Sequence, residues 1–241
     1  MNNNSGESLI TLHNVGLCFR SYDNTVLFSK NRKKPFWALR KISFSVYDHD
    51  RLGIIGRNGA GKSTLSRLIT GVYEPNEGTI ERKINATLLT LGAGFNRQLS
   101  GRDNILINGA YLGFKKMHIR ERFDEIVEFA ELQDFIDEPI RTYSSGMRSR
   151  LAFSIACHLD PELLVLDETL ATGDRFFRAK AESKLSEIMD KCRAMILISH
   201  QESIIQRLCN RAIWLEKGSL MADGPVQEVL KQYANSQNQE H

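Results

Sequence analysis

The sequence predicts an α/β protein built on a parallel sheet with helices on both faces. Buried-strand patterns recur at 51–55, 163–166 and 194–199, each followed by helical or turn sequence. Strands that alternate with helices are typical of parallel sheets. A glycine-rich segment follows the first of these strands, and two acidic residues follow the second. Open α/β sheets place their ligand chemistry at such strand ends.

The remaining elements follow from apolar spacing and turn residues. We expect further strands at 9–19, 38–46, 84–91 and 212–215, and a turn over 73–78. Apolar residues at helical spacing mark 102–112, 119–130 and 133–136. The polar tail from residue 235 is expected to fray. The sequence therefore predicts one domain with these parts: a core of 1–91 and 159–241, and a helical insertion of 92–158.

Composition limits the classes of protein that fit. The 241 residues are 41% apolar, which suffices for a large core, and a net charge of +3 does not require a nucleic-acid partner. Four widely spaced cysteines are expected to be free thiols in a reducing compartment. The start MNNNSGES lacks a secretion signal, and no apolar run approaches the about 20 residues that span a bilayer. We expect a cytosolic protein, or one held at the cytosolic side of a membrane by a partner.

The segment GRNGAGKST, residues 56–64, fits the phosphate-loop pattern G-x-x-x-x-G-K-[ST]. Its glycines let successive backbone N–H groups approach an anion, and a helix that begins at Lys62 adds its positive end. Lys62 is expected to reach the β- and γ-phosphates, and Ser63 to offer its hydroxyl to Mg²⁺. The predicted phosphate-binding residues are Gly56, Asn58, Gly59, Ala60, Gly61, Lys62, Ser63 and Thr64.

The acidic pair after the second strand completes a hydrolytic set. Asp167 is expected to hold Mg²⁺, and Glu168 to polarise the attacking water as a general base. His200 ends another buried strand and either senses the γ-phosphate or is an ordinary hydrogen-bonded histidine. Asp174 carries little information by itself.

A third informative stretch, YSSGMRSRLAF, begins at Tyr143. Ser144 is expected to cap a helix, and a hydroxyl, a glycine and free N–H groups at a helix start form a second anion site. Two phosphate-binding elements in one chain suggest that each nucleotide is shared between two copies. An ordinary capped helix fits the same residues, and both interpretations stay open.

The phosphate loop, serine-glycine segment, acidic strand and strand-end histidine, in this order, resemble an ABC-transporter nucleotide-binding subunit. The resemblance implies a P-loop NTPase (RecA-like) core with a small β subdomain, bound ATP and Mg²⁺, and an ATP-sandwich dimer that hydrolyses ATP. It also implies that the signature residues of one copy contact the γ-phosphate held by Lys62 of the other, and that Asp174 belongs to the D-loop. The signature residues are Ser144, Ser145, Gly146 and Met147.

The family's signature usually reads LSGGQ, whereas this chain has YSSGM. With RSRLAF, LGAGF and SGRDN, it resembles the Wzt-type O-antigen exporters and their capsule and teichoic-acid relatives. That subgroup implies two permease subunits, a lipid-linked polysaccharide as cargo, the cytoplasmic face of the inner membrane, and no nucleic acid. A soluble ABC-type ATPase that acts on nucleic acid or ribosomes, and the ATPase of another ABC transporter, share the same catalytic motifs.

Three departures from the family pattern affect the expected site. The family's glutamine is missing near Leu91 or Gly92, and Gln98 comes several residues too late. The aromatic residue that stacks on adenine is expected at Phe19, with Tyr22 and Trp37 as alternatives. Because the sequence stops at residue 241, we do not expect the C-terminal carbohydrate-binding domain of some Wzt-type proteins.

Residues 22–37, YDNTVLFSKNRKKPFW, mix bulky apolar and basic residues. Such a segment can lie in a membrane interface, and the resemblance implies a short amphipathic gate helix here. A solvated basic loop fits equally well.

Overall fold

The computed structural model describes residues 6–19, 35–89, 94–167 and 175–238. The chain forms two compact units, one made of Met1–Lys83 with Ile198–His241 and the other of Ile84–Leu197. The expected strand–helix alternation and parallel pairing are present, so the predicted α/β class is confirmed. The finer division into a core and a helical insertion at 92–158 stays a prediction.

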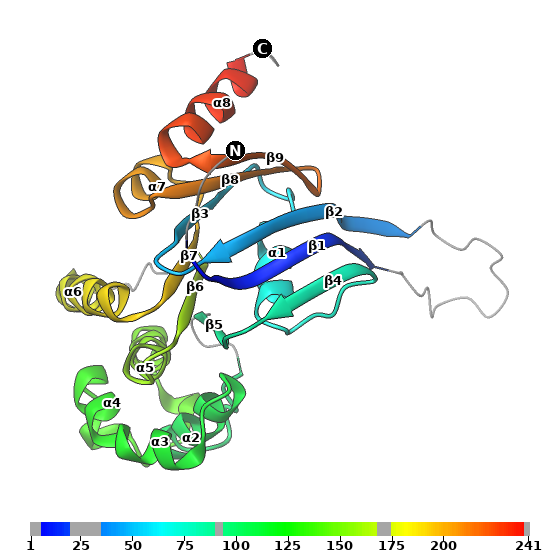
Figure 1. Cartoon of the computed structure of the whole chain (residues 1–241). Helices are drawn as coiled ribbons and strands as arrows, with labels where there is room; N and C mark the ends of the chain where they lie inside the picture. Colours follow the sequence, from blue (N-terminus) through cyan, green and yellow to red (C-terminus); the bar gives the residue numbers. More distant parts are fainter. Residues whose placement is uncertain (1–5, 20–34, 90–93, 168–174, 239–241) are drawn as a thin grey trace, which may run out of the picture. The chain divides into compact units, whose positions relative to one another are not determined.

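The first unit contains a three-stranded antiparallel sheet in the order β2-β1-β4 (Figure 1). Its strands are β1 (Ser8–Phe19), β2 (Phe36–Tyr47) and β4 (Glu77–Arg82). The strands expected at 9–19 and 38–46 are confirmed, and in β2 the alternate residues Ile42, Phe44 and Val46 are buried. β2 begins two residues earlier than expected because Phe36 and Trp37 pair with Phe19 and Cys18.

The same unit contains the strand and helix that flank the phosphate loop. β3 (Arg51–Ile55) runs parallel to β8 (Arg211–Glu216), and β8 pairs antiparallel with β9 (Ser219–Pro225). The helices are α1 (Lys62–Ile69), α7 (Glu202–Leu208) and α8 (Val226–Asn238). α8 packs along β8 and β9 (Figure 1). It continues to Asn238, so residues 235–238, which were expected to fray, belong to the helix, while 239–241 lie outside the described residues. Apolar residues at 226, 229, 230 and 233 bury one helix face.

The second unit combines a parallel strand pair with a group of helices. β5 (Ala86–Leu89) pairs in parallel with β6 (Leu163–Asp167), and β7 (Ala194–Ile198) follows β6 in the sheet order. The segment expected to be one helix over 119–130 is two helices, which meet at Arg122. The helices are α2 (Gly101–Tyr111), α3 (Lys116–Glu121), α4 (Phe123–Ala130), α5 (Ser145–His158), α6 (Arg175–Lys191), and the short η1 (Gln133–Phe135) and η2 (Ile140–Thr142).

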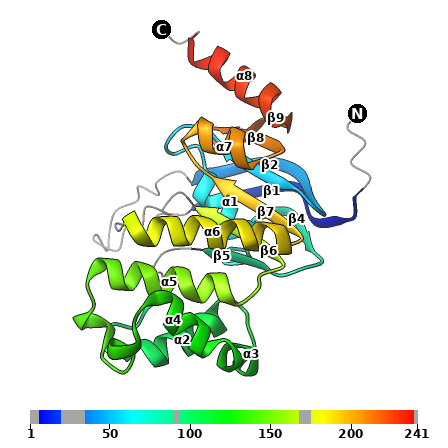
Figure 2. The same cartoon turned by 90° about the vertical axis from the view of Figure 1, so that its left-hand side faces the viewer.

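Two cores hold these helices together. An aliphatic cluster that includes Ile105, Ile126 and Leu151 joins α2, α4 and α5. α5 and α6 lie side by side (Figure 2), where Phe177 of α6 makes an edge-to-face contact with Phe153 of α5, at 5.8 Å between ring centroids. This packing links the helix after the serine-glycine segment to the helix that follows the acidic strand.

Within the described residues, none of the helices is both long enough and apolar enough to cross a membrane. All four cysteines are free thiols, as expected, and Cys157 and Cys209 are buried. Burial raises the pKa of the Cys209 thiol to about 12. The two buried thiols therefore stay protonated at neutral pH and act as packing residues.

Candidate functional site

The phosphate loop leaves the buried strand β3 through residues that only glycine accommodates well. Gly56 and Gly61 have φ angles of 148° and 104°. A Cβ at Gly61 would lie 2.7 Å from Leu39 Cδ2 and 2.9 Å from the Ala38 carbonyl oxygen. The backbone can therefore turn sharply into α1 only with glycine at these positions. The helix begins at Lys62, where the sequence placed it.

Lys62 is folded back over the loop. Its Nζ donates hydrogen bonds to the carbonyl oxygens of Gly56, at 2.7 Å, and Arg57, at 3.2 Å. The side chain is buried, whereas Asn58, Gly59 and Ser63 are exposed. A buried ammonium beside exposed loop N–H groups and a helix N-terminus suits an anion such as a phosphate.

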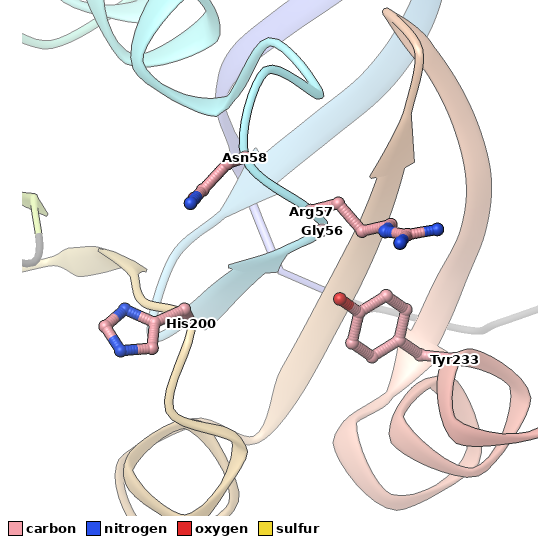
Figure 3. Close-up of a pocket in the computed structure, with 5 residues that line it drawn as sticks. All are labelled: Gly56, Arg57, Asn58, His200 and Tyr233. Atoms are coloured by element: carbon pink, nitrogen blue, oxygen red, sulfur yellow. The ribbon is translucent and has the colours of Figure 1, made fainter. Parts of the chain in front are cut away.

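A pocket of about 440 Å³ lies against this loop (Figure 3), lined by Gly56, Arg57, Asn58, His200 and Tyr233. Asn58 and His200 extend to one side, and Arg57 and Tyr233 lie on the other. The structure thus brings His200, which follows β7, next to the loop. Its catalytic role stays a prediction. Arg57 adds a positive charge to the lining, which suits an anionic ligand.

Tyr233 and Arg57 line the pocket but were not singled out from the sequence. Tyr233 comes from α8, and its ring meets Trp214 of β8 edge to face, at 5.6 Å between centroids. Burial raises the pKa of the Tyr233 hydroxyl, which is therefore protonated at neutral pH. The spacing of apolar residues could have predicted α8, but nothing local indicates that its tyrosine faces a loop far earlier in the sequence.

The acidic strand lies in the second unit. Asp167 is the last residue of β6 and is half-buried, as expected for a carboxylate at a strand end. Glu168 and Asp174 lie outside the described residues, and so do Leu91, Gly92 and Tyr22. Their expected roles stay predictions.

The serine-glycine segment starts α5 as predicted. Ser144 is the N-cap residue, and its Oγ accepts a hydrogen bond from the Met147 N–H at 3.1 Å. Ser144 and Ser145 are exposed, and Gly146 is half-buried. The exposed hydroxyls leave this helix start open to a ligand.

Two of the signature departures belong to the core of the second unit. Tyr143 is buried, and its hydroxyl donates to the Phe135 carbonyl oxygen at 2.6 Å. Burial raises the pKa of Tyr143 to about 12, so the hydroxyl keeps its proton. Met147 packs against the same aliphatic cluster. The chain therefore departs from the family pattern at two positions whose side chains pack in the core of the second unit.

Phe19, the expected adenine-stacking residue, is the last residue of β1 and is 43% exposed. Its ring meets Tyr73 edge to face, with centroids 5.9 Å apart. The alternative Trp37 is half-buried in β2, where the Arg40 guanidinium lies 5.3 Å from its ring centroid. The position of Trp37 corrects the predicted insertion 22–37, whose last two residues belong to β2. Phe19 is more exposed than Trp37, and its adenine-stacking role stays a prediction.

Fold and loop together define an α/β nucleotide-binding protein with a phosphate loop. The family model described as "ABC transporter" matches residues 39–171, more than half of the chain. The chain therefore belongs to the ABC transporter family.

The sequence is 46% identical, over 81% of this chain, to an O-antigen export system ATP-binding protein, RfbB, of Myxococcus xanthus. It is 42% identical, over 85% of this chain, to a teichoic acids export ATP-binding protein, TagH, of Lactococcus lactis. The chain spans only 45% and 44% of these two relatives. An O-antigen export ATP-binding protein of Klebsiella pneumoniae matches more completely, with 40% identity over 86% of this chain and 84% of the relative.

Solved structures agree on the fold. An ATP-binding cassette, solved as a dimer in a post-hydrolysis state with ADP and Pi, superposes with a TM-score of 0.71. It is 17% identical and covers 90% of this chain and 98% of its own length. At this identity the likeness establishes the ABC ATPase fold and nothing finer.

Proposed function

We propose that this chain binds and hydrolyses ATP as the nucleotide-binding subunit of an ABC transporter that exports a lipid-linked bacterial cell-surface polysaccharide. The observation that carries the nucleotide site is Lys62, held by two loop carbonyls at the positive end of α1. The export role rests on relatives whose names include O-antigen and teichoic-acid export. O-antigen is the cargo we favour.

The residues divide the chemistry between binding and hydrolysis. The loop N–H groups and Lys62 bind the β- and γ-phosphates, while His200 holds the water and Glu168 in line. Glu168 takes the proton of the attacking water as general base. The roles of Glu168 and His200 come from the sequence pattern and the family.

Mg²⁺ fits the available donors. Ser63 offers an exposed hydroxyl and Asp167 a half-buried carboxylate, both hard oxygen ligands. Among the described residues there is no group of three or more His, Cys, Asp or Glu that could enclose a metal. Mg²⁺ in nucleotide sites usually keeps waters and phosphate oxygens as its other ligands, so two protein donors suffice. When bound, Mg²⁺ neutralises phosphate charge.

The partners follow from the same proposal. A second copy of the chain would supply Ser144, Ser145 and Gly146 to the phosphate held by Lys62. Two permease subunits would place the assembly at the cytoplasmic face of the inner membrane and carry the polysaccharide. The segment 22–37 stays a candidate for contact with the membrane interface, and its residues 20–34 lie outside the described part of the chain.

The nucleotide site is tested with Lys62→Met and a matched surface control, Lys83→Met. Lys83 is an exposed lysine of the same unit whose ion pair with Glu7 spans 3.8 Å. Loss of a charge-assisted contact of roughly 1.5–3 kcal/mol should weaken Mg-ATP binding by Lys62→Met about 10- to 100-fold. Lys83→Met should match the wild type in isothermal titration calorimetry. Equal affinities in all three proteins would remove Lys62 from the site.

The export role is tested in native membranes. Tagged chain is purified in detergent, and its partners are identified by mass spectrometry. A polytopic permease in about equal amount supports the proposal, and surface polysaccharide should disappear from cells that carry only Glu168→Gln. Recovery with ribosomes or nucleic acid and without a permease would leave the ATPase proposal standing and overturn export.

A further inference from the structure

The turn that follows α1 is tied to the end of β1. α1 ends at Ile69, and the chain returns to β4 through residues 71–76. Asn76 makes two hydrogen bonds across this gap: its Oδ1 accepts from the Cys18 N–H at 2.7 Å, and its own N–H donates to the Gly16 carbonyl at 2.9 Å. The pairing between β1 and β4 is irregular between His13 and Gly16. Asn76 therefore fixes the last residues of β1, just beyond the irregular stretch of strand pairing.

The same turn contacts the exposed ring at the strand end. Tyr73 meets Phe19 edge to face, with an interplanar angle of 77°. Tyr73 is itself held from two sides: its N–H donates to the Arg67 carbonyl at 3.0 Å, and the Arg67 guanidinium lies 5.8 Å from its ring centroid. An edge-to-face contact covers less ring surface than a stacked pair, and Phe19 is still 43% exposed. Phe19 thus has Tyr73 against the edge of its ring and keeps a large exposed surface.

We propose that Tyr73 and Asn76 are positioning residues for the nucleotide base. They hold Phe19 and the end of β1 in the orientation that lets the ring stack on a purine. The inference rests on the proposed function, because it assumes that Phe19 meets the base of a nucleotide whose phosphates lie at Lys62. A half-exposed aromatic side chain samples several rotamers, and a neighbour that restricts it lowers the entropy lost on binding.

In this arrangement the two ends of α1 support the two ends of the bound nucleotide. Its first residue, Lys62, reaches the phosphates, and the turn after its last residue supports the base platform. Figure 1 shows α1 against the β1–β2–β4 sheet, with β4 continuing from that turn. A change in the exit turn should therefore affect base recognition without affecting phosphate binding.

The test compares two ligands, Mg-ATP and inorganic tripolyphosphate with Mg²⁺, by isothermal titration calorimetry on the full chain. Phe19→Ala and Tyr73→Leu should each weaken ATP binding about 3- to 10-fold, the range of an aromatic contact. In the same calorimetry, both variants should bind tripolyphosphate with an affinity within about 2-fold of that of the wild type. Tyr73→Phe keeps the ring and should keep ATP affinity. Asn76→Ala should behave as Tyr73→Leu does, and Asn76→Asp, which retains an acceptor for the Cys18 N–H, should restore binding.

The double variant Phe19→Ala/Tyr73→Leu separates positioning from direct contact. If Tyr73 acts through Phe19, the double variant loses no more ATP affinity than Phe19→Ala alone. Additive losses, equal losses for both ligands, or wild-type ATP affinity in Tyr73→Leu would each overturn the inference. Thermal melting of every variant within a few degrees of the wild type shows that the fold is retained. If the wild-type protein binds tripolyphosphate as tightly as ATP, the base site is overturned. If the wild-type protein binds neither ligand, the proposed function itself is overturned.

Discussion

Two glycines of the phosphate loop, Gly56 and Gly59, share a positive φ but differ in what surrounds them. A Cβ at Gly56 would collide with the Leu215 carbonyl oxygen, whereas a Cβ at Gly59 meets nothing within 4 Å. Gly59→Ala should therefore cost only the conformational strain of about 1–2 kcal/mol. Gly56→Ala adds a steric clash with the β8 backbone, and its loss of unfolding free energy should reach roughly 2–5 kcal/mol. Urea denaturation of both variants measures the difference, and equal losses would contradict the described loop conformation.

A buried histidine outside the nucleotide site predicts how stability depends on pH. Burial lowers the pKa of His158 below its ordinary value of 6.5, with the Lys184 ammonium acting in the same direction. Glu125, Glu187 and the hydrogen bond from Nδ1 to the Ser154 carbonyl, at 2.8 Å, oppose the shift without cancelling it. The unfolded chain therefore binds the proton more readily than the folded one, and stability is full above pH 6.5 and falls as pH drops below it.

Replacing His158 should make the stability of the protein depend less on pH. His158→Phe keeps an aromatic ring beside Phe129, whose centroid lies 4.9 Å from the imidazole. Its unfolding free energy should fall less between pH 7 and pH 5 than that of the wild type, because one proton-linked group is gone. His13→Gln, at an exposed position of β1, serves as the matched control. Identical slopes in wild type and His158→Phe would contradict the prediction.

At the scale of elements, one arginine joins three segments of the first unit. Arg211 of β8 donates to Asp50, in the turn between β2 and β3, at 2.8 Å, and to Asp223 of β9 at 2.6 Å. It also donates to the Ser45 carbonyl of β2 at 2.9 Å. Asp50 is only 5% exposed, and burial raises its pKa even with this partner present. The carboxylate therefore depends on Arg211 for its charge.

Arg211→Met should leave the Asp50 carboxylate buried without this partner and lower the unfolding free energy by about 3–5 kcal/mol. Lys83→Met, which removes an exposed ion pair of the same unit, should change it by less than about 1 kcal/mol. Chemical denaturation at pH 7 compares the two. A loss below 1 kcal/mol for Arg211→Met would show that the three segments are held by apolar packing alone.

The elements that could be predicted from the sequence are those whose residues carry a strong local pattern. β3 was placed at its observed bounds and α1 at its observed start, because a buried strand, a glycine loop and an apolar helical stripe follow one another directly. β4 and β9 were not predicted, since both are largely exposed edge strands with little apolar alternation. The pocket residue Tyr233 was missed because its position depends on how α8 packs against β8. Local patterns do not encode such long-range packing.

For the whole molecule, the phosphate-binding elements are divided between the two units. The loop with Lys62 lies in the first unit, and the helix start at Ser144 lies in the second. In a symmetric sandwich of two copies, each nucleotide would meet the loop of one copy and the helix start of the other. Two variants with different substitutions distinguish this arrangement from binding within one copy.

Lys62→Met removes the loop cation, and Gly146→Asp places a negative charge at the helix start. Gly146 suits this change because an added Cβ meets only Ser144 Oγ, at 3.8 Å, so the fold should tolerate it. Each variant alone should lose ATP hydrolysis because both sites of its dimer carry a lesion. In an equal mixture, half of the dimers combine the two variants, and each of these has one site with both lesions and one intact site. Hydrolysis by the mixture should therefore recover to at most about a quarter of the wild-type rate, because the two-fold symmetry assigns each lesion to a definite site.

Recovery should require ATP-dependent association of the two copies, so sedimentation velocity with and without Mg-ATP accompanies the rate measurement. Gly146→Asp should still bind ATP in calorimetry, since its own loop is intact, and Lys62→Met should bind it weakly. If each nucleotide instead met both elements of a single copy, every copy in the mixture would carry a lesion in its own site. The rate would then stay at the level of the separate variants even though mixed dimers form. That outcome would remove the shared site while leaving the binding role of Lys62 intact.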